Sequence, residues 1–194
     1  MVADKTELRA KMRRFLRAID PQIKRSWDEA IGKNLAQFLK NRKGPLGVYA
    51  PFGDEVDWTK GEWHKEMSLL FPEIESESEM SFHSASLQQL VTKVVFGFKL
   101  KMPPQNPGQS PVVPAVVVVP GLAFSKTGAR LGRGRGYFDR YLAKHRPVAV
   151  GVAYEGQLVE DLPADPTDWP MNFVVTEKSI YDCASERNRL RRMP

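Results

Sequence analysis

The feature that most constrains the fold is residues 112–119, an almost wholly apolar stretch in which six of eight residues are valine. Strands that alternate polar and apolar residues have one face in water, whereas an unbroken β-branched run predicts a strand covered on both faces. Such strands are typical of parallel sheets with helices on either side. Residues 112–119 therefore predict the central strand of an α/β domain.

The rest of the chain alternates helical and strand patterns around this run. Two positions resemble helix starts: Asp4 followed by Glu7, and Asp20 followed by Pro21. Apolar residues recur at helical spacing after each of them. We predict a three-layer α/β sandwich with a mainly parallel sheet, forming one domain over residues 1–194. Further helices are expected at 57–70, 134–145 and 179–192, strands at 46–50, 80–83, 94–101, 148–154 and 173–176, and a proline-rich loop at 103–111.

Composition narrows the classes of function. The 194 residues carry a net charge of +6, so the protein should attract anions such as nucleotides, nucleic acid or acidic metabolites. Cys183 is the only cysteine, which excludes an intrachain disulfide and favours a reducing cytoplasm. The charged start lacks the apolar core of a secretory signal, and no run approaches the roughly 18 apolar residues of a membrane span. We expect a cytoplasmic protein with no membrane partner.

Residues 120–142 carry the clearest chemical pattern, because they lead from the valine run into a predicted helix. Gly132, Gly134 and Gly136 alternate with Arg133 and Arg135. Glycines allow backbone N–H groups to approach a phosphate, and arginine adds forked donors. The loop fits neither common nucleotide-binding fingerprint. By itself, the pattern indicates an anion site, and a flexible or RNA-binding tract remains an alternative.

The segment from Pro120 to Asp139, Pro-Gly-Leu-Ala-Phe-Ser-Lys-Thr-Gly-Ala-Arg-Leu-Gly-Arg-Gly-Arg-Gly-Tyr-Phe-Asp, resembles the signature of the 5-formyltetrahydrofolate cyclo-ligase family. Three other blocks extend the resemblance in the same order along the chain. They are Lys5-x-x-Leu-Arg9, Tyr49-Ala-Pro-Phe-Gly-Asp-Glu-Val56, and 150–154 with Gln157, Leu162-Pro163 and Asp168. Two residues depart from the family pattern: Ser125 stands where an Asp is usual, and Phe138 where a second Tyr is usual.

The resemblance implies a fold like that of the sugar-phosphate isomerase and CoA-transferase group. It also implies a ligase that uses ATP and Mg²⁺ to convert 5-formyltetrahydrofolate, which can be polyglutamylated, to 5,10-methenyltetrahydrofolate with release of ADP and phosphate. The formyl oxygen would be phosphorylated, and N10 would then attack the activated carbon. We expect a monomer without a nucleic-acid partner.

The resemblance also implies roles for individual residues. Arg133 and Arg135 would be the catalytic residues that offset charge on the transferred phosphoryl group, and Asp139 and Asp168 would hold magnesium. ATP would contact Lys5, Arg9, Arg130, Leu131, Gly132, Arg133, Gly134, Arg135, Gly136, Tyr137 and Phe138. The folate would contact Ala50, Glu55, Arg133, Gly134, Arg135, Gly136 and Tyr137.

Each of these residues also has a plainer interpretation. Lys5, Arg9 and Glu55 could be ordinary solvent-exposed residues of a helix face or a loop. Asp139 could stabilise the start of a helix through the helix dipole, and Asp168 could form a turn. Tyr154 and Trp169 could stack on ligand rings, although core packing is the simpler interpretation. Two other functions stay open: an RNA-binding module that uses the basic loop and the cluster at 187–192, and a small-molecule kinase.

Overall fold

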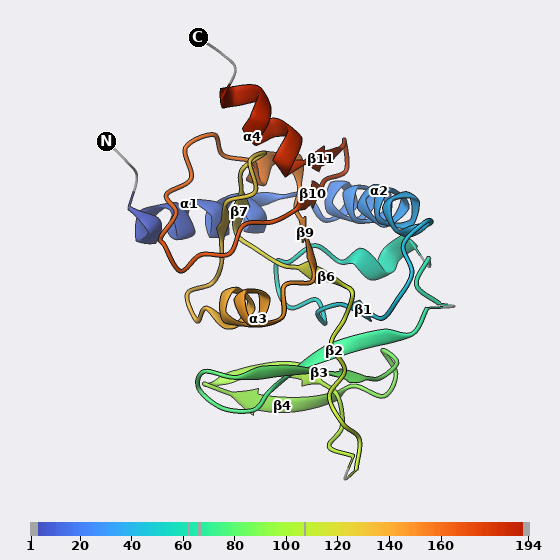
Figure 1. Ribbon diagram of the computed structural model, residues 1–194. Helices are drawn as coiled ribbons and strands as arrows, with labels where there is room; N and C mark the ends of the chain where they lie inside the picture. Colours follow the sequence, from blue (N-terminus) through green and yellow to red (C-terminus); the bar gives the residue numbers. More distant parts are fainter. Residues whose placement is uncertain (1–3, 62, 66, 107, 192–194) are drawn as a thin grey trace.

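The computed structural model describes residues 4–61, 63–65, 67–106 and 108–191, and its centre is a mixed seven-stranded sheet (Figure 1). Neighbouring strands from β10 through β9, β6 and β1 to β2 run parallel, and the two edge strands β11 and β3 run antiparallel to their neighbours. In spatial order the strands are β11 (Ile180–Asp182), β10 (Phe173–Val175), β9 (Val148–Val152), β6 (Val116–Val119), β1 (Leu46–Gly47), β2 (Leu69–Ile74) and β3 (Met80–Ser84).

Side chains of the central strand β6 divide between two apolar cores. Val116 and Val118 pack in the core that includes α1 (Lys5–Ala18) and α2 (Pro21–Leu39). Val117 and Val119 pack in the core that includes α3 (Tyr137–His145) and the first residue of α4 (Cys183–Arg191). Because successive residues of a strand point to opposite faces, the sheet has helices on both sides. The predicted three-layer α/β architecture, with the valine run at its centre, is confirmed.

The predicted starts of the first two helices are also correct. The Asp4 carboxylate accepts a hydrogen bond from the Thr6 backbone N–H at 3.2 Å. Asp20 accepts from the N–H groups of Gln22 and Ile23, with proline in the first turn. These side chains satisfy donors that a helix start leaves unpaired.

Three sequence predictions were wrong in part. Residues 57–70 do not form one helix: they contain the short 3-10 helix η1 (Trp58–Gly61), and the chain then enters β2. The predicted strand at 94–101 is a hairpin of β4 (Val91–Val95) and β5 (Phe98–Met102), which turns at Phe96 and Gly97. The predicted helix at 179–192 begins with β11 before α4.

The reasons are physical. Leu69, Leu70 and Phe71 pack in the sheet, so tertiary burial overrides a helical pattern that happens to include them. Pro114 lies in the valine run and cannot donate to a sheet ladder, and β6 accordingly begins at Val116 while Val113 is exposed. The proline-rich segment contains no helix or strand in its described part, residues 103–106 and 108–111. The described helices include none long and apolar enough to cross a bilayer.

Candidate active site

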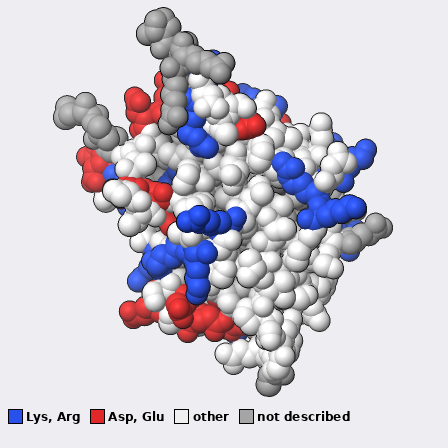
Figure 2. Space-filling view, in the orientation of Figure 1, with Lys and Arg blue, Asp and Glu red and all other residues white. Residues whose placement is uncertain are grey.

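A cleft of about 1000 Å³ opens at the carboxyl ends of the parallel strands, where ligands of open α/β sheets commonly bind. Its walls are the glycine loop (residues 130–136), the α1 helix, the loop after β1 and the β4–β5 hairpin. Figure 2 shows basic side chains on this view of the molecule beside an acidic patch near the turn between β2 and β3. The lining residues of the cleft include the cations Arg13, Arg17 and Arg135 and the apolar side chains of Phe98, Leu100 and Met102.

The backbone of the glycine loop depends on its glycines. Gly134 and Gly136 have φ values of 111° and 68°, which side chains rarely tolerate. Gly136 is the left-handed N-cap of α3, and it supplies no side-chain cap to the helix's first N–H groups. A Cβ at Gly132 would lie 2.8 Å from the Arg130 Nη1 atom. The loop thus presents backbone donors at a helix start, as an anion site requires. β8 (Arg130–Leu131), which pairs with β7 (Ala123–Phe124), leads into it.

Arg130 is a buried part of this loop. Its Nη2 donates to Asp139 Oδ2 at 2.7 Å, and its Nη1 donates to the Pro120 carbonyl oxygen at 3.1 Å. The Nε of Arg130 has no hydrogen-bond partner among the described residues. This Nε is itself buried, so Arg130 contributes charge to the lining of the cleft while its two Nη donors are held by Asp139 and Pro120.

Arg133 connects the glycine loop to the loop after β1. Its Nη2 lies 2.6 Å from Asp54 Oδ1, and its Nε lies 2.9 Å from Glu55 Oε1. Burial raises the pKa of Glu55, with the charge of Arg133 acting against that rise. Burial tends to lower the pKa of Arg133, but the two carboxylates raise it on balance. At the cleft, the glycine loop and the loop after β1 are therefore joined by a forked ion pair.

Arg135 has a different environment. Its guanidinium carbon lies 4.3 Å from the centroid of the Phe96 ring, and no hydrogen bond or ion pair holds its side chain among the described residues. Both Arg133 and Arg135 line the cleft, as expected for residues spaced by two along an extended loop.

Of the two residues of the first helix that were expected to contact ATP, only Arg9 contacts the glycine loop, and neither Lys5 nor Arg9 lines the cleft. Arg9 Nε donates to the carbonyl oxygen of Gly132 at 3.1 Å. Lys5 instead forms ion pairs with Asp165 at 2.5 Å and Asp168 at 2.6 Å. Burial would lower the pKa of Lys5, but these carboxylates raise it on balance.

The two predicted magnesium ligands are near each other and are both paired with cations. Asp139 pairs with Arg130, and Asp168 pairs with Lys5. The Trp169 N–H donates to Asp139 Oδ1 at 3.3 Å, which brings the segment of Asp168 next to Asp139. Burial acts to raise the pKa of Asp168, but the Asp165 N–H and Lys5 lower it on balance. Neither carboxylate lines the cleft.

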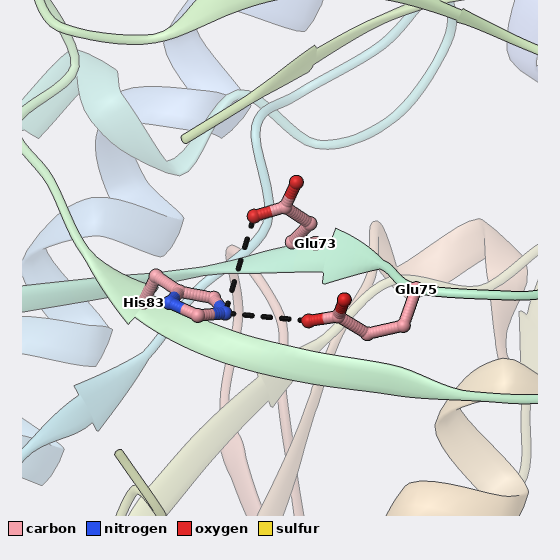
Figure 3. Close-up of side chains that lie close together, drawn as sticks. All are labelled: Glu73, Glu75 and His83. Atoms are coloured by element: carbon pink, nitrogen blue, oxygen red, sulfur yellow. Dashed lines mark hydrogen bonds and ion pairs between the residues drawn. The ribbon is translucent and has the colours of Figure 1, made fainter. Parts of the chain in front are cut away.

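A second group of potential metal ligands, Glu73 of β2, Glu75 just after β2 and His83 of β3, lies outside the cleft (Figure 3). His83 Nε2 is 3.4 Å from Glu75 Oε1 and 3.9 Å from Glu73 Oε2. Lys93 of β4 lies 2.6 Å from Glu73 Oε1, so a cation already offsets the most buried of these carboxylates. The group acts as an ion-paired contact between the hairpin and the sheet.

The remaining predicted residues fall into two sets. Ala50, Tyr137 and Phe138 line the cleft, and the Tyr137 hydroxyl donates to the Ser76 carbonyl oxygen. Leu131 is buried and does not line it, and Tyr154 is fully buried with its hydroxyl donating to Asp28. Tyr154 is therefore a core residue, as its simpler interpretation held.

Sequence reasoning missed many residues of the cleft, among them the cations Arg13, Arg17 and Lys24 of the first two helices, and also Asp54 and Phe96. Asp54 precedes Glu55 in the motif from Tyr49 to Val56, and a second carboxylate at that position could have been predicted to pair with a loop arginine. Phe96 carried no signal, because its place depends on a hairpin turn that the sequence pattern did not predict.

Together, the three-layer fold and the cationic glycine loop at the strand ends define an α/β enzyme with an anion-binding cleft. The model of the 5-formyltetrahydrofolate cyclo-ligase family matches residues 1–177, and the chain belongs to that family. It has 5-formyltetrahydrofolate cyclo-ligase activity.

Curated relatives agree with this assignment. The chain is 26% identical to the mitochondrial 5-formyltetrahydrofolate cyclo-ligase of Arabidopsis thaliana, over 91% of this chain and 75% of that protein. It is 25% identical to the Saccharomyces cerevisiae 5-formyltetrahydrofolate cyclo-ligase, over 90% of this chain and 95% of that protein. The solved structure of Aquifex aeolicus 5,10-methenyltetrahydrofolate synthetase aligns with a TM-score of 0.77 and 33% identity, covering 92% of each chain.

Proposed function

We propose that this protein uses ATP to close the ring of 5-formyltetrahydrofolate, giving 5,10-methenyltetrahydrofolate, ADP and phosphate. The observation that carries the proposal is one cleft lined both by the glycine loop, with Arg133 and Arg135, and by Glu55 of the adjoining loop after β1. The glycine loop suits a triphosphate, and Glu55 offers a carboxylate to hydrogen-bond a folate ring. This juxtaposition fits a reaction that joins those two substrates.

The chemistry follows from the poor leaving ability of an amide oxygen. The formyl oxygen attacks the γ-phosphorus of ATP, and the bond from that phosphorus to ADP breaks. N10 then attacks the activated formyl carbon, and inorganic phosphate leaves with the former formyl oxygen. The residues of this chain would contribute mainly orientation and charge neutralisation, as in other phosphoryl transfers.

The nucleotide phosphates would bind at the glycine loop and the uncapped start of α3. Arg130 would add positive charge beside the phosphates, and Arg9 would approach from α1 beside Gly132. Arg133 and Arg135 would offset charge on the transferred phosphoryl group, because planar forked donors match its oxygens. These residues fit an anionic nucleotide.

Magnesium, when bound with the nucleotide, would supply further charge neutralisation at the phosphates. Asp139 and Asp168 would hold it, because the ion prefers oxygen ligands and often uses one or two carboxylates beside waters and phosphates. Each carboxylate faces a cation, Arg130 or Lys5, and neither carboxylate lines the cleft, so these ion pairs would have to open for both carboxylates to bind the ion.

The folate would occupy the part of the cleft next to the loop after β1. Glu55 would accept hydrogen bonds from the ring, and Ala50 would allow close approach of the ring to the backbone. The side-chain wall beyond them is apolar, with Phe98, Leu100 and Met102 of the hairpin. An aromatic substrate would bury its faces there.

The deciding experiment is an absorbance assay with purified protein, ATP, magnesium and 5-formyltetrahydrofolate. We expect near-ultraviolet absorbance of methenyltetrahydrofolate to grow only when ATP is present, with one phosphate released per product. A stable phosphorylated folate without methenyl product would instead indicate a small-molecule kinase. Absence of any product, with salt-sensitive RNA binding, would indicate the RNA-binding alternative.

A further inference from the structure

Of the two arginines between the loop glycines, Arg135 has no carboxylate partner among the described residues, and it rests on an aromatic ring at the tip of the β4–β5 hairpin. The Phe96 ring lies under the guanidinium at 4.3 Å, and its other neighbour is Tyr137, with ring centroids 6.4 Å apart and planes 27° from parallel. Arg140 in turn lies over Tyr137 at 5.1 Å. Arg135, Phe96, Tyr137 and Arg140 therefore form a chain of cation and ring contacts between the hairpin and α3.

Phe96 has a backbone conformation that its residue type disfavours. Its φ is 51°, in the left-handed region that is easy for glycine and strained for a bulky side chain. Residues held in such conformations persist where their surroundings fix them, and they cluster at functional sites. Burial does not explain the choice of Phe96, because 39% of the residue is exposed.

The hairpin is anchored through both of its strands. Lys93 of β4 pairs with the buried Glu73 of β2 at 2.6 Å, and the Phe98 ring contacts Phe52 edge-on. The tip is thereby held where Phe96 lines the cleft together with Arg135. Figure 1 shows β4 beside β3, at the same end of the sheet.

The two loop arginines are oriented in different ways. Carboxylates of Asp54 and Glu55 engage the N–H donors of Arg133, whereas a ring face contacts Arg135 and leaves its N–H edge available. An arginine can stack on an aromatic face and donate in its own plane at the same time. The ring would thus orient Arg135 without competing with an anionic ligand.

We propose that Phe96 is the positioning residue for Arg135, whose guanidinium it holds over the cleft with free donors for the phosphates of the nucleotide. The identity of the anion rests on the proposed function. The positioning itself rests on the stack, the strained backbone and the shared cleft.

The test compares variants of Phe96 by calorimetric ATP binding without folate, by turnover and by melting temperature. Phe96→Gly removes the ring and suits the positive φ, so we expect an unchanged or raised melting temperature with ATP affinity and turnover lowered about fivefold. Phe96→Asn, which also tolerates this backbone, should show the same loss. Phe96→Tyr keeps an aromatic ring and should retain the ATP affinity and turnover of the parent. Val94→Ala, on the same hairpin but 70% exposed and outside the cleft, is the matched control and should change nothing.

A double-mutant comparison separates positioning from general packing. In an Arg135→Met background, Phe96→Gly should cause no further loss of ATP affinity or turnover. Parental ATP binding and turnover in Phe96→Gly would overturn the inference. So would a further fivefold loss of ATP affinity in the Arg135→Met background. A loss of ATP affinity that accompanies a lower melting temperature would also overturn it, because it would indicate a packing role. If the parent binds ATP but forms no methenyl product, the proposed function fails, and the ATP comparison still decides the role of Phe96.

Discussion

The two walls of the cleft hold their functional side chains by different means. On the glycine-loop wall, Arg130 and Arg133 are fixed by carboxylates that lie mostly away from solvent. On the hairpin wall, rings and exposed apolar side chains dominate, and Arg135 extends from the loop to rest on one of them. Charge pairing gives a fixed geometry but occupies donors, whereas ring stacking leaves donors free. The side chains of the glycine-loop wall are therefore fixed by ion pairs before a phosphate binds, whereas the apolar side chains of the hairpin wall can adjust to the ligand.

The largest expected effect is on the ion-paired wall. Asp139→Asn would leave the Arg130 guanidinium buried opposite a neutral group, and we expect a loss of about 2 kcal/mol of unfolding free energy. Thermal unfolding measures the loss, and turnover over a magnesium series measures the proposed metal role.

The matched control for that experiment is Glu186→Gln, which removes a pair with Arg189 on the exposed surface of α4. Exposed pairs contribute little, so its unfolding should stay within about 0.5 kcal/mol of the parent. Equal stability of Asp139→Asn and the parent would show that the glycine-loop wall does not depend on its charge pairs.

The second prediction contrasts the two loop arginines. The variants compared are Arg133→Lys and Arg135→Lys, which keep the positive charge but lose the planar pair of guanidinium N–H donors. We expect at least one of them to lower turnover about tenfold or more. Arg133→Lys should also raise the KM for folate, because Arg133 contacts Glu55, while Arg135→Lys should affect mainly ATP. Arg191→Lys, in the terminal helix, should change little. Parental kinetics in all three would mean that backbone and metal hold the phosphate.

The third prediction concerns the contact from α1. Removal of the first ten residues would delete Leu8, which is buried, so a point variant is the sharper test. Arg9→Met should weaken ATP binding about fivefold and leave folate binding unchanged, because Arg9 meets the carbonyl oxygen of Gly132. Calorimetry with each ligand checks this, and Arg25→Met, exposed on α2 outside the cleft, serves as control. Equal weakening for both ligands would contradict a nucleotide-specific role.

The smallest expected effect is on the anchor of the hairpin wall. Lys93→Met leaves Glu73 without its closest cation, and we expect a stability loss of about 1 kcal/mol. The KM for folate should rise about twofold, because the anchored strands carry the apolar wall. Lys99→Met on β5 is the control, since no ion pair of its side chain is found in the described part of the chain. An unchanged KM would show that the hairpin keeps its place without this ion pair.

Much of the fold was predictable because its signals are local. The valine run required cover on both faces, and Asp4 and Asp20 marked helix starts by chemistry confined to one turn. The hairpin at residues 91–102 was missed because its turn has Phe96 rather than a typical turn residue before Gly97. The strand β2 was missed because its apolar residues also suited a helix, and only burial in the sheet decides between the two.

By itself, the sequence determined the layers of the fold, the family and the glycine loop, because these depend on residue type and on spacing along the chain. The tertiary structure decided which partner each charged side chain has. Arg133 meets Asp54 and Glu55 from a distant loop, Lys5 meets the Asp168 segment, and Arg135 meets Phe96. Such pairings join residues far apart in sequence, and their energies depend on distance, burial and orientation, which only the packed chain sets.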